Sequence, residues 1–303
     1  MLWFHRVRFK RINMQEITYL APTSLGDVYT ALADGKRSVL LAGGTDIIVQ
    51  LREGRSDAEQ VIDLKHIPEL TQFAFNSSGD LEIGAAVPFA EIYENAEIID
   101  RLPALIDCAT LVGGIQIQSR AGFGGNLCNA SPAADTTPAL IALGAILHIG
   151  SANQVRELAV EDFFLGPGQN ALEDGEILLQ IVIQNQGSNS AAYFHRFIPR
   201  NEMDIAVANA GVSLSLNDAR DRIENARVAI GAVAPTPLLV SEAAEALIGK
   251  EPGEAAFAAA GDAAANAASP ITDMRGSAAQ RVHLSRVLTV RALERALKRI
   301  EEN

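Results

Sequence analysis

The sequence predicts an α+β protein with more than one domain. Its first half, up to about residue 166, mixes short strands and helices without the regular strand–helix–strand alternation of a doubly wound sheet. Near Glu176 the pattern changes to longer apolar segments typical of an antiparallel sheet, and from Leu238 onward the chain is alanine-rich and helical. A chain of 303 residues is long enough for two or three domains, each with its own core.

The first elements are short and are marked by capping and turn residues. Ser24 and Asp27 match the S-x-x-D capping pattern, which predicts the start of a short helix that Gly35 ends. Strands are predicted at residues 38–41, 61–64, 73–75 and 81–87. The last two flank Ser77-Ser-Gly-Asp80, which indicates a hairpin.

The next stretch is predicted to be helical and then extended. Residues 88–113 have helical periodicity with one break at Pro103, which fits the first turn of the second helix. Residues 115–126 are predicted to be a strand that leads into a glycine-rich loop. A short apolar helix at 138–143 ends at Gly144, and residues 145–149 and 154–160 are predicted to form a hairpin.

The second half is predicted to be an antiparallel sheet followed by helices. The strands are expected at 177–183, 191–198, 205–216 and 223–233. The last helix starts at a second capping box, Ser277 to Gln280, and extends to about Ile300. Its basic side chains indicate a solvated face, with contact to an acidic partner subunit as the alternative.

The chain is expected to divide into three parts, with the main boundary between about residues 166 and 190. Residues 1–13 are basic and aromatic and are predicted to be a loose tail or an incorrectly assigned start, with a docking arm as the alternative. Residues 14–185 form the first domain and residues 186–303 the second. Because the first 13 residues lack the apolar segment of a secretory signal, we expect a cytoplasmic protein.

Two glycine-rich segments about 80 residues apart carry the functional signal. The first is VLLAGGTDII, residues 39–48, and the second is IQSRAGFGGNLCNASPAAD, residues 117–135. Glycine allows positive φ and close approach of the backbone to a ligand, and successive N–H groups can then converge on an anion. One glycine pair alone is more often a tight turn, but two such segments favour a diphosphate held from two sides.

Other nucleotide sites fit less well. The stretch from Gly122 ends in Leu127 where the Rossmann fingerprint needs its third glycine, and no P-loop pattern occurs. The net charge of −12 argues against nucleic acid as a partner and means that backbone N–H groups must hold a bound anion. Asp46 would repel a phosphate, so we assign it to sugar hydroxyls or backbone bracing. Asp135 fits a helix N-cap and a ligand hydroxyl acceptor equally well.

Metal centres and a membrane span are not expected. The two cysteines, Cys108 and Cys128, cannot form a zinc or iron–sulfur site by themselves. We expect both to be small, buried, apolar side chains rather than partners in a disulfide. No apolar run reaches the 18 residues that suggest a transmembrane helix.

Residues 40–47 and 124–135 together closely resemble the FAD-binding subunit of molybdenum hydroxylases, the xanthine dehydrogenase and aerobic carbon monoxide dehydrogenase family. The resemblance extends over nearly all of the chain from Met14, and the segments 203–206 and 271–277 resemble signatures of the family's C-terminal domain. It implies a p-cresol methylhydroxylase-type FAD-binding domain in two subdomains. A C-terminal α+β domain with a small antiparallel sheet and helices would follow.

The resemblance also implies a set of cofactor-binding residues. Leu178 matches a family position that touches the cofactor, and Arg196 lies near the place where relatives often have a lysine, with His195 as a competing choice. Ile205 is expected near the flavin ring. The predicted FAD-binding residues are Leu40, Leu41, Ala42, Gly43, Gly44, Thr45, Asp46, Ile47, Gly122, Phe123, Gly124, Gly125, Asn126, Asp135, Leu178 and Arg196.

The chain departs from the family pattern at three positions. Relatives usually have a hydroxyl residue at Gly122, a β-branched residue at Phe123 and often arginine at Gln118. A side-chain hydroxyl bond to phosphate is therefore lost or replaced by water. Neither glycine segment contains a histidine, so FAD is expected to bind non-covalently.

By this resemblance the chain is an electron-transfer flavoprotein subunit. Molybdopterin on a large subunit and [2Fe–2S] clusters on a small subunit would supply electrons, which FAD would pass to an acceptor such as NAD or a quinone. No acid–base or nucleophilic residue is assigned. Two alternatives stay open: a stand-alone FAD-dependent oxidoreductase of the same fold, and a flavin-free assembly subunit.

Overall fold

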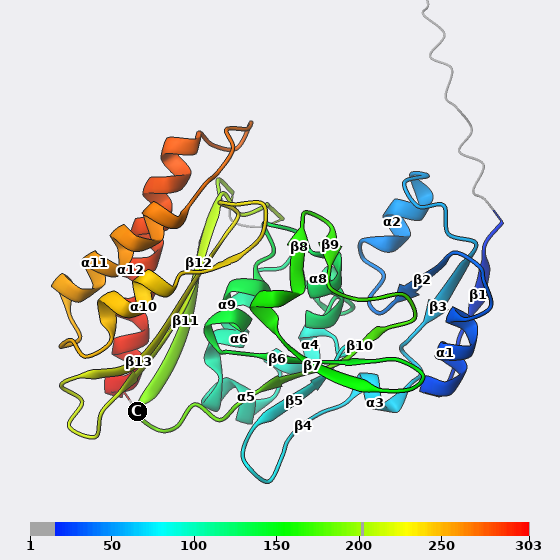
Figure 1. Cartoon of the computed structure of the whole chain (residues 1–303), viewed down its shortest axis with the longest axis horizontal. Coiled ribbons are helices and arrows are strands. Elements are labelled where there is room, and N and C mark those ends of the chain that lie inside the picture. The colour runs from blue at the N-terminus through cyan, green and yellow to red at the C-terminus, as the bar shows by residue number, and fades with distance from the viewer. Residues whose placement is uncertain (1–15, 201–202, 303) are drawn as a thin grey trace, which may run out of the picture.

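The computed structural model describes residues 16–200 and 203–302, which form three larger sheets and a small two-stranded one. The helices are distributed among them along the chain (Figure 1). The predicted tail at residues 1–13 lies outside the described residues. Within the described part of the chain, no helix is both long and apolar enough to cross a membrane.

The first subdomain is a three-stranded parallel sheet in the order β1-β3-β2. Its core contains Val28, Ile62 and Leu70, all fully buried. Ser24 caps the first helix by accepting a hydrogen bond from the Asp27 N–H at 3.2 Å, as predicted. The elements are β1 (Thr18–Leu20), α1 (Leu25–Leu32), β2 (Ser38–Leu41), α2 (Ile47–Arg52), β3 (Gln60–Asp63) and α3 (Pro68–Thr71).

The second subdomain is a five-stranded antiparallel sheet in the order β4-β5-β10-β6-β7, packed against short helices. The predicted hairpins β4–β5 and β6–β7 both form. The strands are β4 (Phe73–Phe75), β5 (Leu81–Gly84), β6 (Ile146–Gly150), β7 (Val155–Ala159) and β10 (Ile177–Ile183), with the small pair β8 (Phe164–Gly166) and β9 (Gln169–Asn170) beside them. The helices are α4 (Phe89–Tyr93), α5 (Ala96–Arg101), α6 (Pro103–Ala109), α7 (Ile115–Gln118), α8 (Phe123–Asn129), α9 (Thr136–Ala142) and the 3₁₀ turn η1 (Val160–Phe163).

The C-terminal part is a four-stranded antiparallel sheet with three helices. The strands follow the order β11-β12-β13-β14, and the long helix α12 lies against the sheet (Figure 1). Ser277 accepts a hydrogen bond from the Gln280 N–H at 3.2 Å, as its capping box predicts. The elements are β11 (Ser190–Phe197), β12 (Ala208–Leu216), β13 (Ile223–Gly231), β14 (Leu238–Leu239), α10 (Ser241–Leu247), α11 (Glu254–Ala267) and α12 (Ala278–Glu302).

Two predictions of local structure are wrong. The stretch 115–126 is not a strand: α7 and the start of α8 occupy it. Gln118, at the end of α7, is buried although it is polar, and its amide donates to the Thr110 carbonyl at 2.8 Å. The strand at 177–183 forms, but it is the central strand of the second subdomain and pairs with β5 and β6 rather than joining the later strands.

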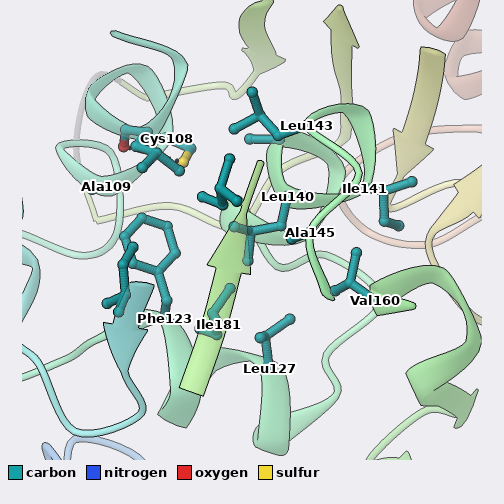
Figure 2. Close-up of a cluster of buried hydrophobic side chains, with 14 of the residues drawn as sticks. Cys108, Ala109, Phe123, Leu127, Leu140, Ile141, Leu143, Ala145, Val160 and Ile181 are labelled. Atoms are coloured by element: carbon teal, nitrogen blue, oxygen red, sulfur yellow. Dashed lines mark hydrogen bonds between the residues drawn. The ribbon is translucent and has the colours of Figure 1, made fainter. Parts of the chain in front are cut away.

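The largest core lies under the five-stranded sheet and extends to the C-terminal part. Phe123, Leu127 and Ile181 point into this cluster from α8 and β10 (Figure 2). Phe123 meets Phe89 edge to face, with ring centroids 4.9 Å apart. Cys108 is buried in the same cluster, Cys128 is half-buried, and both are free thiols.

Candidate functional site

A cavity of about 620 Å³ lies where the first subdomain, the second subdomain and the β11–β12 connection meet. The first glycine segment and α2 form one side, and α7, α8 and the start of α9 form another. Residues on the cavity wall are Val39, Leu40, Ala42, Gly43, Gly44, Thr45, Asp46, Ile47, Gln50, Leu64, Ala85, Val112, Gly113, Ile117, Ala121, Gly122, Gly124, Gly125, Asn126, Cys128, Asn129, Ser131, Ala133, Ala134, Asp135, Leu172, Leu178, Asp204 and Ile205.

The first glycine segment is the loop between β2 and α2. Parallel pairing of β2 with β3 fixes where the loop begins. Gly44 has a φ of +76°, a conformation that a side chain would strain, so the turn requires glycine there.

The two glycine segments lie against each other. A Cβ atom on Gly43 would stand 2.1 Å from the carbonyl oxygen of Arg120, so glycine is required for this approach. In return, the Arg120 side chain donates from Nε to the Gly43 carbonyl at 3.3 Å. Segments 77 residues apart in sequence therefore form one continuous edge of the cavity.

Glycines in the second segment are of two kinds. A Cβ on Gly122 would meet the Val87 carbonyl oxygen at 2.0 Å, and one on Gly124 would meet that of Ala85 at 2.2 Å. These two glycines let α8 pack on the chain that follows β5. Gly125 differs, because a Cβ there would have no atom within 4 Å and would extend into open space.

The cavity wall carries acidic but no basic side chains. Its charged residues are Asp46, Asp135 and Asp204, and no lysine or arginine is among the residues of the described chain that line it. Asp135 directly precedes α9 but makes no side-chain capping bond to it. Instead, its carboxylate accepts a hydrogen bond from Arg196 Nη1 in a buried ion pair.

Burial dominates the electrostatics of Asp135. It raises the pKa of the carboxyl to about 6, while the Arg196 guanidinium opposes the rise. The pair joins α9 of the second subdomain to β11 of the C-terminal part. His195, the competing residue, is half-buried beside Tyr193, and burial together with Arg291 and Arg295 lowers its pKa.

Most predicted FAD-binding residues are brought together at this cavity. Thirteen of the sixteen line it, and Ile205 does too. The other three do not line it: Leu41 is buried beneath the first segment, Phe123 points into the core, and Arg196 lies behind Asp135.

Sequence reasoning did not select several residues of the wall. Cys128, Asn129 and Ser131 lie inside the second motif, so the motif itself was a signal for them. Val112 and Leu172 had no such signal, because only the folded chain brings their segments to the cavity.

Comparisons with known proteins point to one family. Residues 13–184 match the family described as "FAD binding domain in molybdopterin dehydrogenase", and residues 193–296 match "CO dehydrogenase flavoprotein C-terminal domain". The xanthine dehydrogenase FAD-binding subunit of Escherichia coli O157:H7 is 28% identical, over 92% of this chain and 96% of its own length. Caffeine dehydrogenase subunit beta of Pseudomonas sp. strain CBB1 is 30% identical, over 93% and 95%. A chain of the carbon monoxide dehydrogenase from Hydrogenophaga pseudoflava has a similar structure, with a TM-score of 0.89 and 28% identity over 94% of this chain and 98% of that chain.

Proposed function

This chain belongs to the FAD-binding subunits of the molybdenum hydroxylases, a family of oxidoreductases, and from that premise we propose that it binds FAD in the cavity between its two glycine segments and transfers electrons there. The electrons would come from [2Fe–2S] clusters on a small partner subunit and, before that, from molybdopterin on a large one. An acceptor such as NAD or a quinone would take them away.

The contact between the two glycine segments is the observation that carries the placement. Their backbones meet at Gly43 and Arg120 and border a volume within the range of about 300–1,000 Å³ typical of ligand pockets. Gly125 faces open space, so a diphosphate could approach its backbone without meeting a side chain. With no basic side chain on the wall, backbone N–H groups are the donors that remain for an anion.

Each part of the wall has a separate task in this proposal. Bound FAD supplies the redox chemistry, since it exchanges electrons singly or in pairs, and the protein supplies position and electrostatics. Leu178 and Ile205 contribute apolar surface that limits water at the flavin end, and Asp46 is left to accept from sugar hydroxyls.

We also propose that the FAD-binding domain covers residues 14–185 and the C-terminal domain residues 186–303. The end of β10 at Ile183 supports this boundary, because that strand completes the five-stranded sheet, and β11 begins the next sheet at Ser190.

Placement of FAD is tested by Gly125→Val. A β-branched side chain at this position would extend into the cavity, so the variant is expected to purify without flavin while its C-terminal domain stays folded. Gly26→Val is the matched control, because Gly26 also lies in a short helix and faces solvent, with its nearest neighbour at 3.8 Å. Flavin content from the visible spectrum and folding from circular dichroism are the measurements. Stoichiometric flavin in Gly125→Val would show that the second segment does not hold the cofactor.

The electron-transfer role is tested by partner dependence. The full chain loaded with FAD is expected to oxidise or reduce no organic substrate by itself, apart from any exchange of electrons with NAD(P)H. Activity is expected only when the molybdopterin and iron–sulfur subunits, sought among the products of neighbouring genes, are added. Turnover of an alcohol or sugar nucleotide by the chain alone would instead establish a stand-alone oxidoreductase.

A further inference from the structure

A buried ion pair stands directly behind the cavity wall. Arg196 on β11 donates from Nη1 to Oδ2 of Asp135, and the side chains of arginine and aspartate are only 4% and 10% exposed. Asp135 borders the cavity, whereas Arg196 does not. Any effect of Arg196 on a ligand in the cavity therefore passes through the aspartate.

The hydrogen bonding of this pair is incomplete. Among residues 16–200 and 203–302, Oδ1 of Asp135 has no donor and Nε of Arg196 has no acceptor. The neighbouring Asn209 donates to the Ala134 carbonyl at 3.2 Å, and its amide also helps Arg196 to lower the pKa of the Asp135 carboxyl. A buried carboxylate with unused accepting capacity is costly unless a further donor reaches it.

We infer that Arg196 is a positioning residue: it holds Asp135 in its ionised form at the cavity wall, where the carboxylate accepts a hydrogen bond from a hydroxyl or N–H group of FAD. The inference rests on the proposed placement of FAD in this cavity. It also assigns Arg196 a role different from direct cofactor contact, which the family resemblance implied.

The surrounding charges leave Asp135 as the group that titrates near neutral pH. Arg196 faces it from β11, and β12 contributes the uncharged Asn209. From α6, the buried thiol of Cys108 has a pKa raised well above its usual value, by burial first and then by Asp107 and Asp135. From α8, burial raises the pKa of Cys128 to about 12.

The direction of the pH effect follows from these contacts. Burial already raises the pKa of Asp135 to about 6 against the pull of Arg196, so removing the guanidinium should raise it further. A donor on FAD favours the ionised carboxylate. FAD affinity should therefore be highest above the pKa and fall about tenfold per pH unit below it.

The experiment is a titration of the full chain with FAD across the neutral and mildly acidic range, followed by quenching of flavin fluorescence. Wild type is expected to lose affinity as pH falls through about 6. Arg196→Met should move that midpoint upward by about two pH units, which would weaken binding about tenfold at neutral pH. Arg196→Lys should stay close to wild type, and Asp135→Asn should abolish this pH dependence.

A neighbouring residue provides the control. His195 is also titratable, and burial with Arg291 and Arg295 lowers its pKa, but it lies next to Arg196 on a strand, where successive side chains face opposite sides of the sheet. His195→Gln is expected to keep the wild-type midpoint. If Arg196→Met does not fold, the Asp135→Asn variant tests the inference instead. FAD binding that keeps its pH dependence in Asp135→Asn would overturn the inference.

Two failures can be told apart. An equal loss of affinity at every pH in Arg196→Met, with an unchanged midpoint, would make Arg196 a structural residue only and overturn the inference. The inference would also fail if neither variant of the pair affected binding while Gly125→Val abolished it. If Gly125→Val also bound FAD normally, the placement of the cofactor itself would be wrong.

Discussion

Gly124 and Gly125 are adjacent in α8, but the space around their Cα atoms differs. A Cβ on Gly124 would lie 2.2 Å from a backbone oxygen of Ala85, whereas one on Gly125 would meet nothing within 4 Å. Overpacking against backbone costs about 1–3 kcal/mol, and alanine is preferred over glycine inside a helix by about 0.5–1 kcal/mol. Identical substitutions at the two positions should therefore have opposite effects on stability.

For the flavin-free chain, we expect Gly124→Ala to lower the free energy of unfolding by about 1–3 kcal/mol. Gly125→Ala should raise it by up to about 1 kcal/mol while weakening FAD binding. Denaturant unfolding measures both values, and Gly26→Ala gives the helix-propensity gain at a site far from the cavity. A loss of stability in Gly125→Ala would mean that its surroundings are packed.

At this scale the sequence predicted which stretches of chain meet at the cavity but not the direction of each side chain. The family resemblance implied that Phe123 and Arg196 bind the cofactor, because a resemblance marks a stretch of chain rather than the direction of a side chain. In the structure Phe123 packs on Phe89, and Arg196 donates a hydrogen bond to Asp135. Which side of α8 or β11 faces the cavity depends on tertiary packing, which spacing in the sequence does not reveal.

Helix α8 forms despite two glycines that disfavour it. Phe123 and Leu127, four residues apart, bury their side chains in the core and offset the low helix propensity of the stretch between them. Periodicity predicted the isolated helices and hairpins well because their signals are local. It failed at residues 115–126 and for the pairing of β10, where contacts far apart in sequence decide the structure.

Near its end, helix α12 contacts the FAD-binding half through the side chain of Arg299. Arg299 donates from both terminal nitrogens to Asp107 at 2.7 Å, donates to the Ala192 carbonyl at 2.7 Å, and lies 4.4 Å from the Tyr193 ring centroid. The adjacent Lys298 pairs with Glu302, and both of those side chains are more than half exposed. The solvated face predicted for this helix thus applies to Lys298 but not to Arg299.

Replacing each of these neighbours by leucine should separate the two kinds of ion pair. Arg299→Leu is expected to lower the free energy of unfolding by about 2–3 kcal/mol, because it leaves the largely buried Asp107 without its charged donor. Lys298→Leu should change it by no more than about 0.5 kcal/mol. Urea unfolding measures both, and adding Asp107→Ala to Arg299→Leu should cost little more. If the two leucine variants lowered the free energy of unfolding equally, Arg299 would contribute no more to stability than the exposed Lys298, and its contact with Asp107 would not stabilise the domain interface.

At the scale of the whole molecule, the proposed diphosphate site lies in an acidic protein. The net charge is −12, and the charged residues on the cavity wall are three aspartates. The two halves of the chain both supply wall, since Asp204 and Ile205 come from the β11–β12 connection. A site of this kind must use fixed backbone dipoles for a diphosphate, because the average field of the protein opposes the ligand.

This charge distribution predicts an unusual response of FAD binding to salt. Raising the ionic strength from about 0.01 M to 1 M shortens the Debye length from about 30 Å to about 3 Å, which screens the long-range repulsion but not short contacts to N–H groups. The FAD dissociation constant should therefore stay constant or decrease, with the association rate increasing.

Arg120→Gln, which changes an exposed cation beside the cavity, should leave this trend unaltered. Fluorescence titration and stopped-flow mixing of the full chain measure the two quantities. Binding that weakens tenfold or more with added salt would show that cationic side chains hold the diphosphate, and it would contradict recognition by the backbone of the two glycine segments.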